Sequence, residues 1–358
     1  MSQFAIRSIL IIKPSSLGDV VHTLPSLSIL RRAFPEAQIR WLVNSEWAPL
    51  LEGNPHLDEV VIFPRQEFRG LRGLKRVLPW AKALRERVRA DLVLDYQGLL
   101  RSALIARNCR VPDGRILGLS DAREGARFFY DEVANVRGVN HAVDRYLKLT
   151  VLATRETESP RQDGGQIEWL LPQGSPPAGF TGDEPFVLLH PFSRGAGKSL
   201  TPAQVLDFCR ALAPRRVLLA GRSDARVELL ENVTDLLNQT TIPELIWLIR
   251  RAAFVVSVDS GPMHIAAAIT PSLLSIHTWS DPAKVGPYRP EAWVWKDGHL
   301  FQMRDLANPR APHEAADLSS IGSWTRAPHE AADLSSIGSW IAARLANPPP
   351  APAPSPHG

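Results

Sequence analysis

Short apolar, β-branched runs alternate with longer helical stretches through most of the chain. In the first half, this pattern predicts strands separated by helices, of which the longest is Leu74–Val88. The second half continues it with helices near Pro202–Leu212, Pro243–Arg251 and Pro262–Ala268. Such alternation is typical of a parallel sheet covered by helices. Strands are expected at Ser8–Ile12, Ile39–Val43, Val60–Phe63, Leu92–Asp95, Arg115–Gly118, Phe186–His190, Arg216–Ala220, Phe254–Val258 and Leu273–His277.

A segment with little periodicity, Glu156–Phe180, separates the two series of strands and is rich in proline and glycine. Because a single hydrophobic core rarely grows beyond about 250 to 300 residues, a chain of 358 residues is long enough for two domains. We therefore predict an N-terminal domain over residues 1–160, a linker over 161–180 and a C-terminal domain over 181–300.

The last part of the chain breaks this order. The string RAPHEAADLSSIGSW occurs at Arg310–Trp324 and again at Arg326–Trp340. Two copies are fewer than a stable repeat array needs, so the string indicates a local duplication. We expect residues 301–346 to add a helix or a loop without chemistry of its own. Residues 347–358 hold six prolines and are expected to form a disordered tail.

Composition narrows the class of protein. Only two cysteines occur, Cys109 and Cys209, which favours a reducing compartment over a disulfide framework. No signal peptide and no run of about 18 apolar residues is found, so we expect a cytoplasmic protein. The formal net charge is only +4, which does not demand a nucleic-acid partner.

The loop after the first strand, Lys13–Ser16, leads into a helix whose apolar side begins at Val20. Gly18 permits a tight backbone, and Asp19 lies at or near the start of the helix. Asp is a favoured N-cap residue, so Asp19 could simply cap the helix. Alternatively, its carboxylate could act as a general base in a cleft.

The loop after Phe186–His190 combines two glycines with hydroxyl groups and a lysine, Lys198, just before a helix. This composition suits a phosphate-binding turn, although Phe192 stands where a Walker loop would need glycine. An ordinary surface loop has a similar composition.

The strongest local signal follows Phe254–Val258, where Asp259, Ser260 and Gly261 precede a helix that contains His264. A glycine at a helix N-terminus lets backbone N–H groups approach a diphosphate, and Asp259 could orient a sugar hydroxyl. The alternatives are that Asp259 caps the helix and that His264 is a core residue. Ligands of open α/β sheets bind at the carboxyl ends of strands, which favours a nucleotide-sugar site.

Two strings carry a resemblance to a known family. ILIIKPSSLGDVVHTLPSL resembles the N-terminal signature of the lipopolysaccharide heptosyltransferases, and FVVSVDSGPMHIAAAI resembles their donor-site segment. The resemblance spans residues 8–290 in family order. It includes DYQGLLRSAL, LSDAREGARFFY, NHAVDRYLKL and SDPAKVGPY.

The resemblance implies the α/β architecture called GT-B, two Rossmann-like βαβ domains that face each other across a cleft. It implies inverting transfer of L-glycero-D-manno-heptose from ADP-heptose to the 3-deoxy-octulosonic acid (Kdo) inner core of lipopolysaccharide. Asp19 would be the general base and Lys198 the contact to the donor diphosphate. The remaining roles implied are Ser193, Asp259, Ser260, Gly261 and His264 at the donor, and Gly18 and Arg123 at the acceptor.

The sequence contains no Asp-x-Asp pair of the kind that holds Mg²⁺ against a diphosphate, so no obligatory metal or other cofactor is expected. The acceptor is an anion, and arginines suit carboxylate and phosphate oxygens. A basic patch after the third strand could bind it and hold the enzyme peripherally against the inner membrane, or could be only a solvated helix face. The patch consists of Arg65, Arg69, Arg72, Lys75 and Arg76.

Some positions depart from the family pattern. Leu200 stands where members often have tryptophan, and either Asp224 or Glu228 could take the place of the ribose-binding glutamate. Two other functions therefore stay open. The chain could transfer another nucleotide-sugar or use another acceptor, or it could be a binding module without turnover.

Overall fold

The structure is a computed structural model that describes residues 6–156, 167–180, 184–194, 197–307 and 334–346. It divides into two compact units, and the boundary between Gly174 and Ser175 falls within the segment predicted as linker. In the short helix α8 (Pro282–Val285), residues 283–285 group with unit 1 and Pro282 groups with unit 2. Most of the duplicated segment and the whole C-terminal tail lie outside the described residues.

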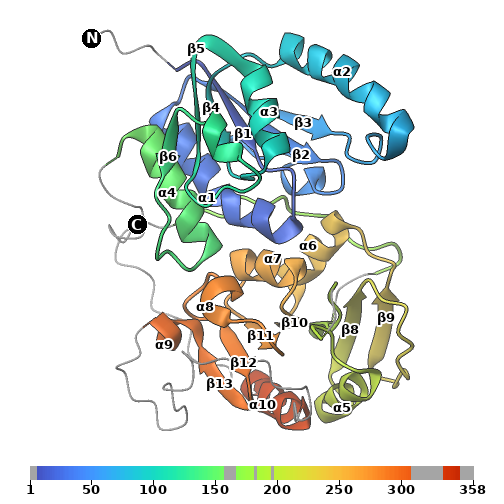
Figure 1. The fold of residues 1–358 in the computed structure, drawn as a ribbon. Coiled ribbons are helices and arrows are strands. Elements are labelled where there is room, and N and C mark those ends of the chain that lie inside the picture. Colours follow the sequence, from blue (N-terminus) through green and yellow to red (C-terminus); the bar gives the residue numbers. More distant parts are fainter. Residues whose placement is uncertain (1–5, 157–166, 181–183, 195–196, 308–333, 347–358) are drawn as a thin grey trace. The chain divides into compact units, whose positions relative to one another are not determined.

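Unit 1 is built on a six-stranded parallel sheet of order β3-β2-β1-β4-β5-β6 (Figure 1). This is the strand order of dinucleotide-binding Rossmann folds. The central strands contain apolar runs, such as residues 9–12 and 92–94, because both faces of a parallel sheet are buried. The elements are β1 (Ser8–Ile12), α1 (Leu17–Ala33), β2 (Gln38–Asn44), η1 (Ala48–Leu50), β3 (Glu59–Phe63), α2 (Gly70–Arg87), β4 (Ala90–Asp95), α3 (Leu100–Cys109), β5 (Arg110–Leu119), η2 (Ala126–Phe129), β6 (Glu132–Ala134) and α4 (Ala142–Thr154).

Unit 2 repeats the same topology. Its sheet has the order β9-β8-β7-β10-β11-β12, with β13 added antiparallel to β12. The first strand is therefore again flanked by the second and the fourth. The elements are β7 (Phe186–His190), α5 (Pro202–Leu212), β8 (Arg216–Gly221), β9 (Val233–Leu237), α6 (Ile242–Arg251), β10 (Phe254–Val258), α7 (Gly261–Ile269), β11 (Leu273–His277), β12 (Trp293–Lys296), β13 (His299–Gln302), α9 (Met303–Ala307) and α10 (Leu334–Ala346).

Local sequence signals fix where the helices of unit 2 begin. Thr201 is the N-cap of α5, and its hydroxyl accepts a hydrogen bond from the N–H of Gln204 while the Gln204 amide accepts from the N–H of Thr201. Thr241 and Glu244 form the same reciprocal pair at α6. Each pair satisfies N–H groups that the helix itself leaves without partners.

The nine predicted strands and the named helices are confirmed, and the α/β fold with them. Sequence reasoning missed β6, β9, β12 and β13, which are three to five residues long. Two of them, β6 and β9, are the end strands of their sheets and carry polar residues such as Glu132 and Asp235.

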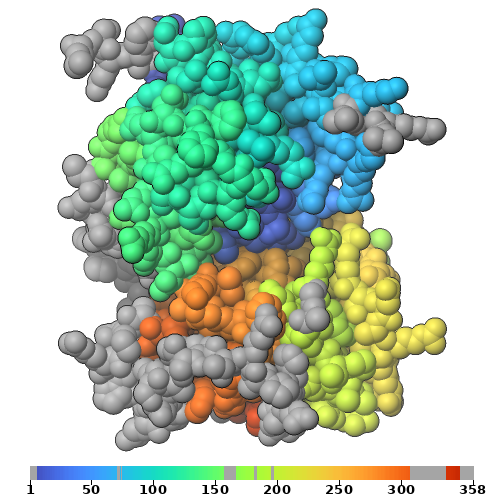
Figure 2. All heavy atoms as spheres, in the orientation of Figure 1, coloured from blue at the N-terminus to red at the C-terminus, as the bar shows by residue number. Residues whose placement is uncertain are grey.

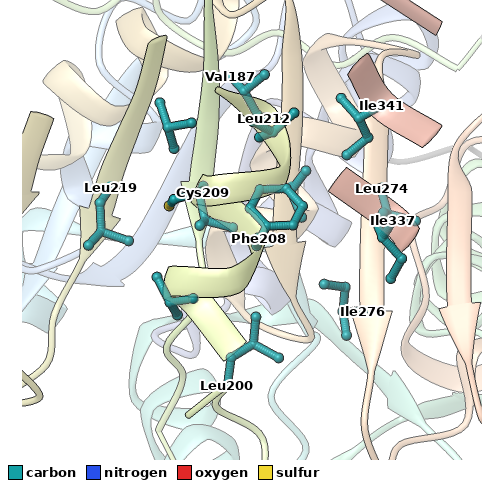
Figure 3. Packing of buried hydrophobic residues seen from close by; sticks show 14 of the residues in the cluster. Val187, Leu200, Phe208, Cys209, Leu212, Leu219, Leu274, Ile276, Ile337 and Ile341 are labelled. Carbon is teal, nitrogen blue, oxygen red and sulfur yellow. The ribbon is translucent and has the colours of Figure 1, made fainter. Parts of the chain in front are cut away.

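Helix α10 is part of unit 2, although residues 301–346 were predicted as a segment separate from the C-terminal domain. It begins inside the second copy of the duplicated string and packs against α5 (Figure 3). Ile337 and Ile341 are buried against a core that contains Phe208 and Leu212. Gly338 permits this approach, because a Cβ atom there would lie 2.6 Å from the Cβ of Ala211.

Candidate active site

In both units the strand order reverses beside the first strand, between β1 and β4 and between β7 and β10. Such switch points leave room for ligands at the carboxyl ends of the strands. The loops after β1, β7 and β10 lead to or hold the predicted base and the predicted donor residues. The cleft expected between the domains stays a prediction.

Asp19 lies in the first turn of α1, directly after β1. Its Oδ2 accepts hydrogen bonds from the N–H and the hydroxyl of Ser16, at 3.0 and 2.8 Å. Its Oδ1 accepts a 2.7 Å bond from the Tyr146 hydroxyl of α4 and lies 3.7 Å from the Lys13 Nζ. About a third of the Asp19 side chain, 35%, is exposed. The carboxylate is thus fixed through both oxygens and is still reachable.

Asp19 is not the N-cap residue of α1. Ser16 is the N-cap, and Asp19 is the third residue of the helix. Asp19 does take part in capping, since its carboxylate closes a capping box on Ser16. Capping uses Oδ2, whereas Oδ1 accepts the hydrogen bond from Tyr146. Helix capping and the predicted role as a base therefore do not depend on the same oxygen. Gly18, predicted beside it, is buried in the same turn.

The surroundings of Asp19 favour its ionised form. Burial by itself would raise the pKa of the carboxyl, but the charge of Lys13 and the hydrogen bonds from Ser16 and Tyr146 outweigh it, so the pKa lies below its usual range. Burial also lowers the pKa of Lys13, against the opposing effect of Asp19. The Lys13 Nζ donates to the Tyr96 carbonyl and lies 4.8 Å from the centre of the Tyr146 ring.

In unit 2, Lys198 and Asp259 form an ion pair at 2.8 Å. Ser193 lies in the same loop as Lys198, and its hydroxyl donates to the backbone carbonyl of Asp259 at 3.0 Å. These bonds join the loop after β7 to the loop after β10. The Lys198 Nζ also lies 5.4 Å from the centre of the Trp279 ring, which is 41% exposed.

The loop after β10 leads into α7. Ser260 is the N-cap, Gly261 is the first helical residue, and His264 lies one turn further, largely buried. His277, at the end of β11, is buried between the hydroxyls of Ser275 and Ser280 at 3.0 and 2.9 Å. Because α7 begins two residues after Asp259, its N-terminal N–H groups and the positive end of its dipole lie beside the Lys198–Asp259 pair.

Two pKa shifts describe the charge of this region. Burial lowers the pKa of His277 to about 4, so its ring is neutral at neutral pH. Burial would raise the pKa of Asp259, but the ion pair and hydrogen bond with Lys198 favour the charged carboxylate, and the pKa lies below its usual value. Lys198 is the cation that pairs with the ionised Asp259.

Neighbouring residues of the loop after β7 differ in their burial. Phe192 is 4% exposed and belongs to the core of unit 2, and so does Leu200, which occupies the position where tryptophan was expected. Ser193 is the polar member at the site. Asp224 and Glu228 are both exposed, and the choice of a ribose ligand between them stays open.

The predicted acceptor arginines of unit 1 lie in two loops, Arg65 and Arg69 after β3 and Arg123 after β5. Arg65, after β3, lines a pocket, whereas Arg69 and Arg123 do not line it. Arg69 is the N-cap residue of α2 and is exposed, and Arg123 is exposed before η2. Arg76 pairs with Glu67 at 3.4 Å, as on a solvated helix face. The side chain of Arg72 lies outside the described part of the structure.

Sequence reasoning missed two residues of the Asp19 site, Lys13 and Tyr146. The sequence does contain a signal for Lys13, because this lysine directly follows the apolar strand β1. In the structure it is 3% exposed. Tyr146 is 127 residues away from Asp19, and only the packing of α4 against α1 brings it close.

Within the described residues, no group of three or more His, Cys, Asp or Glu side chains could hold a metal ion. No helix in that part of the chain is long and apolar enough to cross a membrane.

Two doubly wound α/β domains are the architecture of the GT-B class of glycosyltransferases. The fold is similar to that of E. coli heptosyltransferase WaaC with ADP, with a TM-score of 0.66, 24% identity and coverage of 80% of this chain and 92% of that chain. It is also similar to E. coli ADP-heptose lps heptosyltransferase II, with a TM-score of 0.62 and 21% identity over 80% of this chain and 90% of that chain.

The chain belongs to glycosyltransferase family 9 (heptosyltransferase), whose model matches residues 77–310. It is 28% identical over 295 residues to lipopolysaccharide heptosyltransferase 1 of Salmonella typhimurium, covering 78% of this chain and 91% of that protein. It is 30% identical to the Pseudomonas aeruginosa protein of the same name, covering 78% and 81%. These matches confirm the predicted family and the prediction of a glycosyltransferase.

Proposed function

We propose that the chain is an inverting transferase that moves L-glycero-D-manno-heptose from ADP-heptose to the Kdo inner core of lipopolysaccharide. The curated relatives named lipopolysaccharide heptosyltransferase 1 support this substrate class. Two similar structures contain ADP and ADP-2-deoxy-2-fluoro heptose, which supports a donor of the same kind.

The observation that carries the proposal is the environment of Asp19. A general base must be ionised, oriented and reachable by the hydroxyl whose proton it takes. Lys13, Ser16 and Tyr146 favour the ionised carboxylate and fix both of its oxygens, while a third of the side chain is exposed. The acceptor O–H gives its proton to Asp19 as the oxygen forms a bond to the anomeric carbon.

The leaving group needs stabilisation at the same time. As the bond between the anomeric carbon and the β-phosphate oxygen breaks, the electron pair stays on ADP. We assign the stabilisation of this charge to Lys198, the Ser193 hydroxyl and the N-terminal turn of α7 with Ser260 and Gly261. Asp259 positions Lys198 and, with His264, belongs to the donor site. Attack opposite to the departing ADP inverts the anomeric centre.

The proposal includes the place of action. An acceptor built on lipid presents its sugar at a membrane, and the exposed arginines of unit 1, among them Arg65, Arg69 and Arg123, offer charge to its anionic groups. We propose a cytoplasmic enzyme with peripheral contact to the inner membrane.

The test is a transfer assay with purified protein, ADP-heptose and deacylated Kdo-lipid A, run with and without EDTA. The proposal predicts ADP release, a product with inverted anomeric configuration, and the same rate with the chelator. Turnover of other nucleotide-sugars alone would contradict the donor, and donor binding without turnover would contradict catalysis.

A further inference from the structure

The loop after β11 reaches the lysine of the candidate donor site within unit 2. Its first two residues are Thr278 and Trp279. The Thr278 hydroxyl donates a 2.7 Å hydrogen bond to the backbone carbonyl of Gly197. The centre of the Trp279 ring lies 5.4 Å from the Lys198 Nζ. In Figure 2, orange atoms of the chain around β11 meet yellow-green atoms of the chain around β7 and α5 on the surface of unit 2.

The backbone is tied down on both sides of Lys198. The residue before it, Gly197, is held through its carbonyl by Thr278. The residue after it is Ser199, whose hydroxyl accepts from the N–H of Ser193 at 3.0 Å and donates to the carbonyl of Ser193 at 3.1 Å. A binding residue that is held in place before its ligand arrives loses less conformational entropy on binding. The bond from Thr278 therefore favours ligand binding by Lys198.

The ammonium group of Lys198 has two partners of different kinds. It donates to the Asp259 carboxylate at 2.8 Å, and it lies near the ring of Trp279. The face of an aromatic ring carries negative charge density and attracts a cation. Because an ammonium has three N–H groups and the Lys198 side chain is 26% exposed, it can still donate to a phosphate oxygen.

Trp279 has no part in the core of unit 2. Its side chain is 41% exposed, and it is absent from the cluster of apolar residues that fills that core. Packing therefore does not explain a tryptophan at this position. The contact with the lysine does, because among aromatic side chains tryptophan attracts a cation most strongly.

We propose that Thr278 and Trp279 position Lys198 for the diphosphate of the donor. Thr278 acts through the backbone carbonyl of Gly197, and Trp279 acts through the ammonium group. Both are positioning residues, since each acts through the lysine. The inference rests on the proposed function for the assignment of Lys198 to a diphosphate.

The first test is a calorimetric titration of the full chain with ADP, using pairs of variants that keep or remove one chemical group. Trp279→Leu removes the ring and should weaken ADP binding by about fivefold, whereas Trp279→Phe keeps a ring and should stay within about twofold of the wild type. Thr278→Val is isosteric without the hydroxyl and should also lose about fivefold, whereas Thr278→Ser keeps the hydroxyl and the affinity. Leu229→Ala is the control, because Leu229 is an exposed apolar residue elsewhere in unit 2.

The second test combines Trp279→Leu with Lys198→Ala. Since the ring acts through the ammonium group, its removal should change ADP affinity by less than about twofold once the lysine is absent. A ring that only supports the loop would cost the same factor in both backgrounds.

Equal losses in both backgrounds, or an equal loss in Trp279→Phe and Trp279→Leu, would overturn the role of Trp279. An unchanged dissociation constant in Thr278→Val would overturn the role of Thr278, and wild-type protein that does not bind ADP would overturn both. If ADP binding responds as expected but no heptosyl transfer occurs, the positioning of Lys198 stands and the proposed function fails.

Discussion

At the residue scale, each unit pairs a carboxylate with a lysine in its candidate site, but the more exposed partner differs between the two pairs. Asp19 is a third exposed while Lys13 is buried, whereas Asp259 is buried and Lys198 is the more exposed partner. In unit 1 the reachable group is therefore an anion that can accept a proton. In unit 2 it is a cation that can bind phosphate oxygens.

Replacing Tyr146 tests the hydrogen bond that holds Asp19. Tyr146→Phe keeps the ring that packs on Tyr96 and removes only the hydroxyl that donates to Oδ1. Because this bond lowers the pKa of Asp19, its loss should raise that pKa. Asp19 would then be protonated at a higher pH, and the acid limb of the kcat/KM profile should move to higher pH.

The measurement is the pH–rate profile of transfer for both proteins, with Leu104→Ala as a control on an exposed position of unit 1. A uniform loss of rate without movement of the acid limb would show that Tyr146 has only a structural role.

Lys198→Ala should weaken both donor binding and turnover, because the lysine is the cation nearest to the proposed diphosphate. Loss of one preorganised donor to a developing negative charge typically raises the barrier by about 2.7 to 4 kcal/mol. Donor kinetics and ADP titration check this prediction, with Arg210→Ala on the exposed side of α5 as the control. Unchanged ADP-sugar kinetics in the lysine variant would refute the assignment.

At the scale of elements, the close packing of α10 on α5 depends on a single glycine. Gly338→Val would place carbon atoms within the space of Ala211 and should separate the helices. Overpacking of this kind typically reduces the free energy of unfolding by about 1 to 3 kcal/mol.

Urea unfolding of Gly338→Val and of Ser339→Val checks this prediction, since the neighbouring serine is exposed and makes a matched control. Equal free energies of unfolding for the two variants would mean that α10 does not depend on this contact.

Elements with strong local signals could be predicted, and elements that depend on tertiary partners could not. The apolar runs of β1 and β7 and the caps Thr201 and Thr241 identify their elements without any distant contact. By contrast, β6 contains only Glu132–Ala134 and forms because β5 offers a parallel edge. The contribution of α10 to the core of unit 2 could not be predicted, because its sequence occurs twice. Only the second copy is followed by Ile341, which is buried in the core.

The same limit applies to the candidate site. Asp19, Lys198 and Asp259 follow predicted strands, so their placement at strand ends could be foreseen. The ion pair of Lys198 with Asp259 spans 61 residues, and the bond from Tyr146 to Asp19 spans 127. Such pairs are set by which strands and helices become neighbours, and no local pattern encodes them.

At the scale of the whole molecule, two buried histidines should make stability depend on pH. Burial lowers the pKa of His190 and of His277 to about 4, from an ordinary value of 6.5. The unfolded chain takes up protons below pH 6.5, and the folded chain does so only near pH 4. The stabilisation is therefore complete above pH 6.5 and is lost as the pH falls toward 4, by up to roughly 3 kcal/mol for each histidine.

Urea unfolding between pH 7.5 and pH 4.5 measures this effect, and both histidines belong to unit 2. The variant His277→Asn should show a shallower dependence. A free energy of unfolding that does not change over this range would contradict the neutral, buried histidines.

The central claim is that Asp19 takes the proton from the acceptor hydroxyl, and single-turnover transfer by Asp19→Asn tests it most directly. The amide keeps the shape of the side chain and cannot accept the proton. We predict that the rate of heptosyl transfer falls by about 10² to 10⁴, while the dissociation constant of ADP-heptose and the melting temperature stay close to those of the wild type. Transfer by this variant at a near-normal rate would contradict the account.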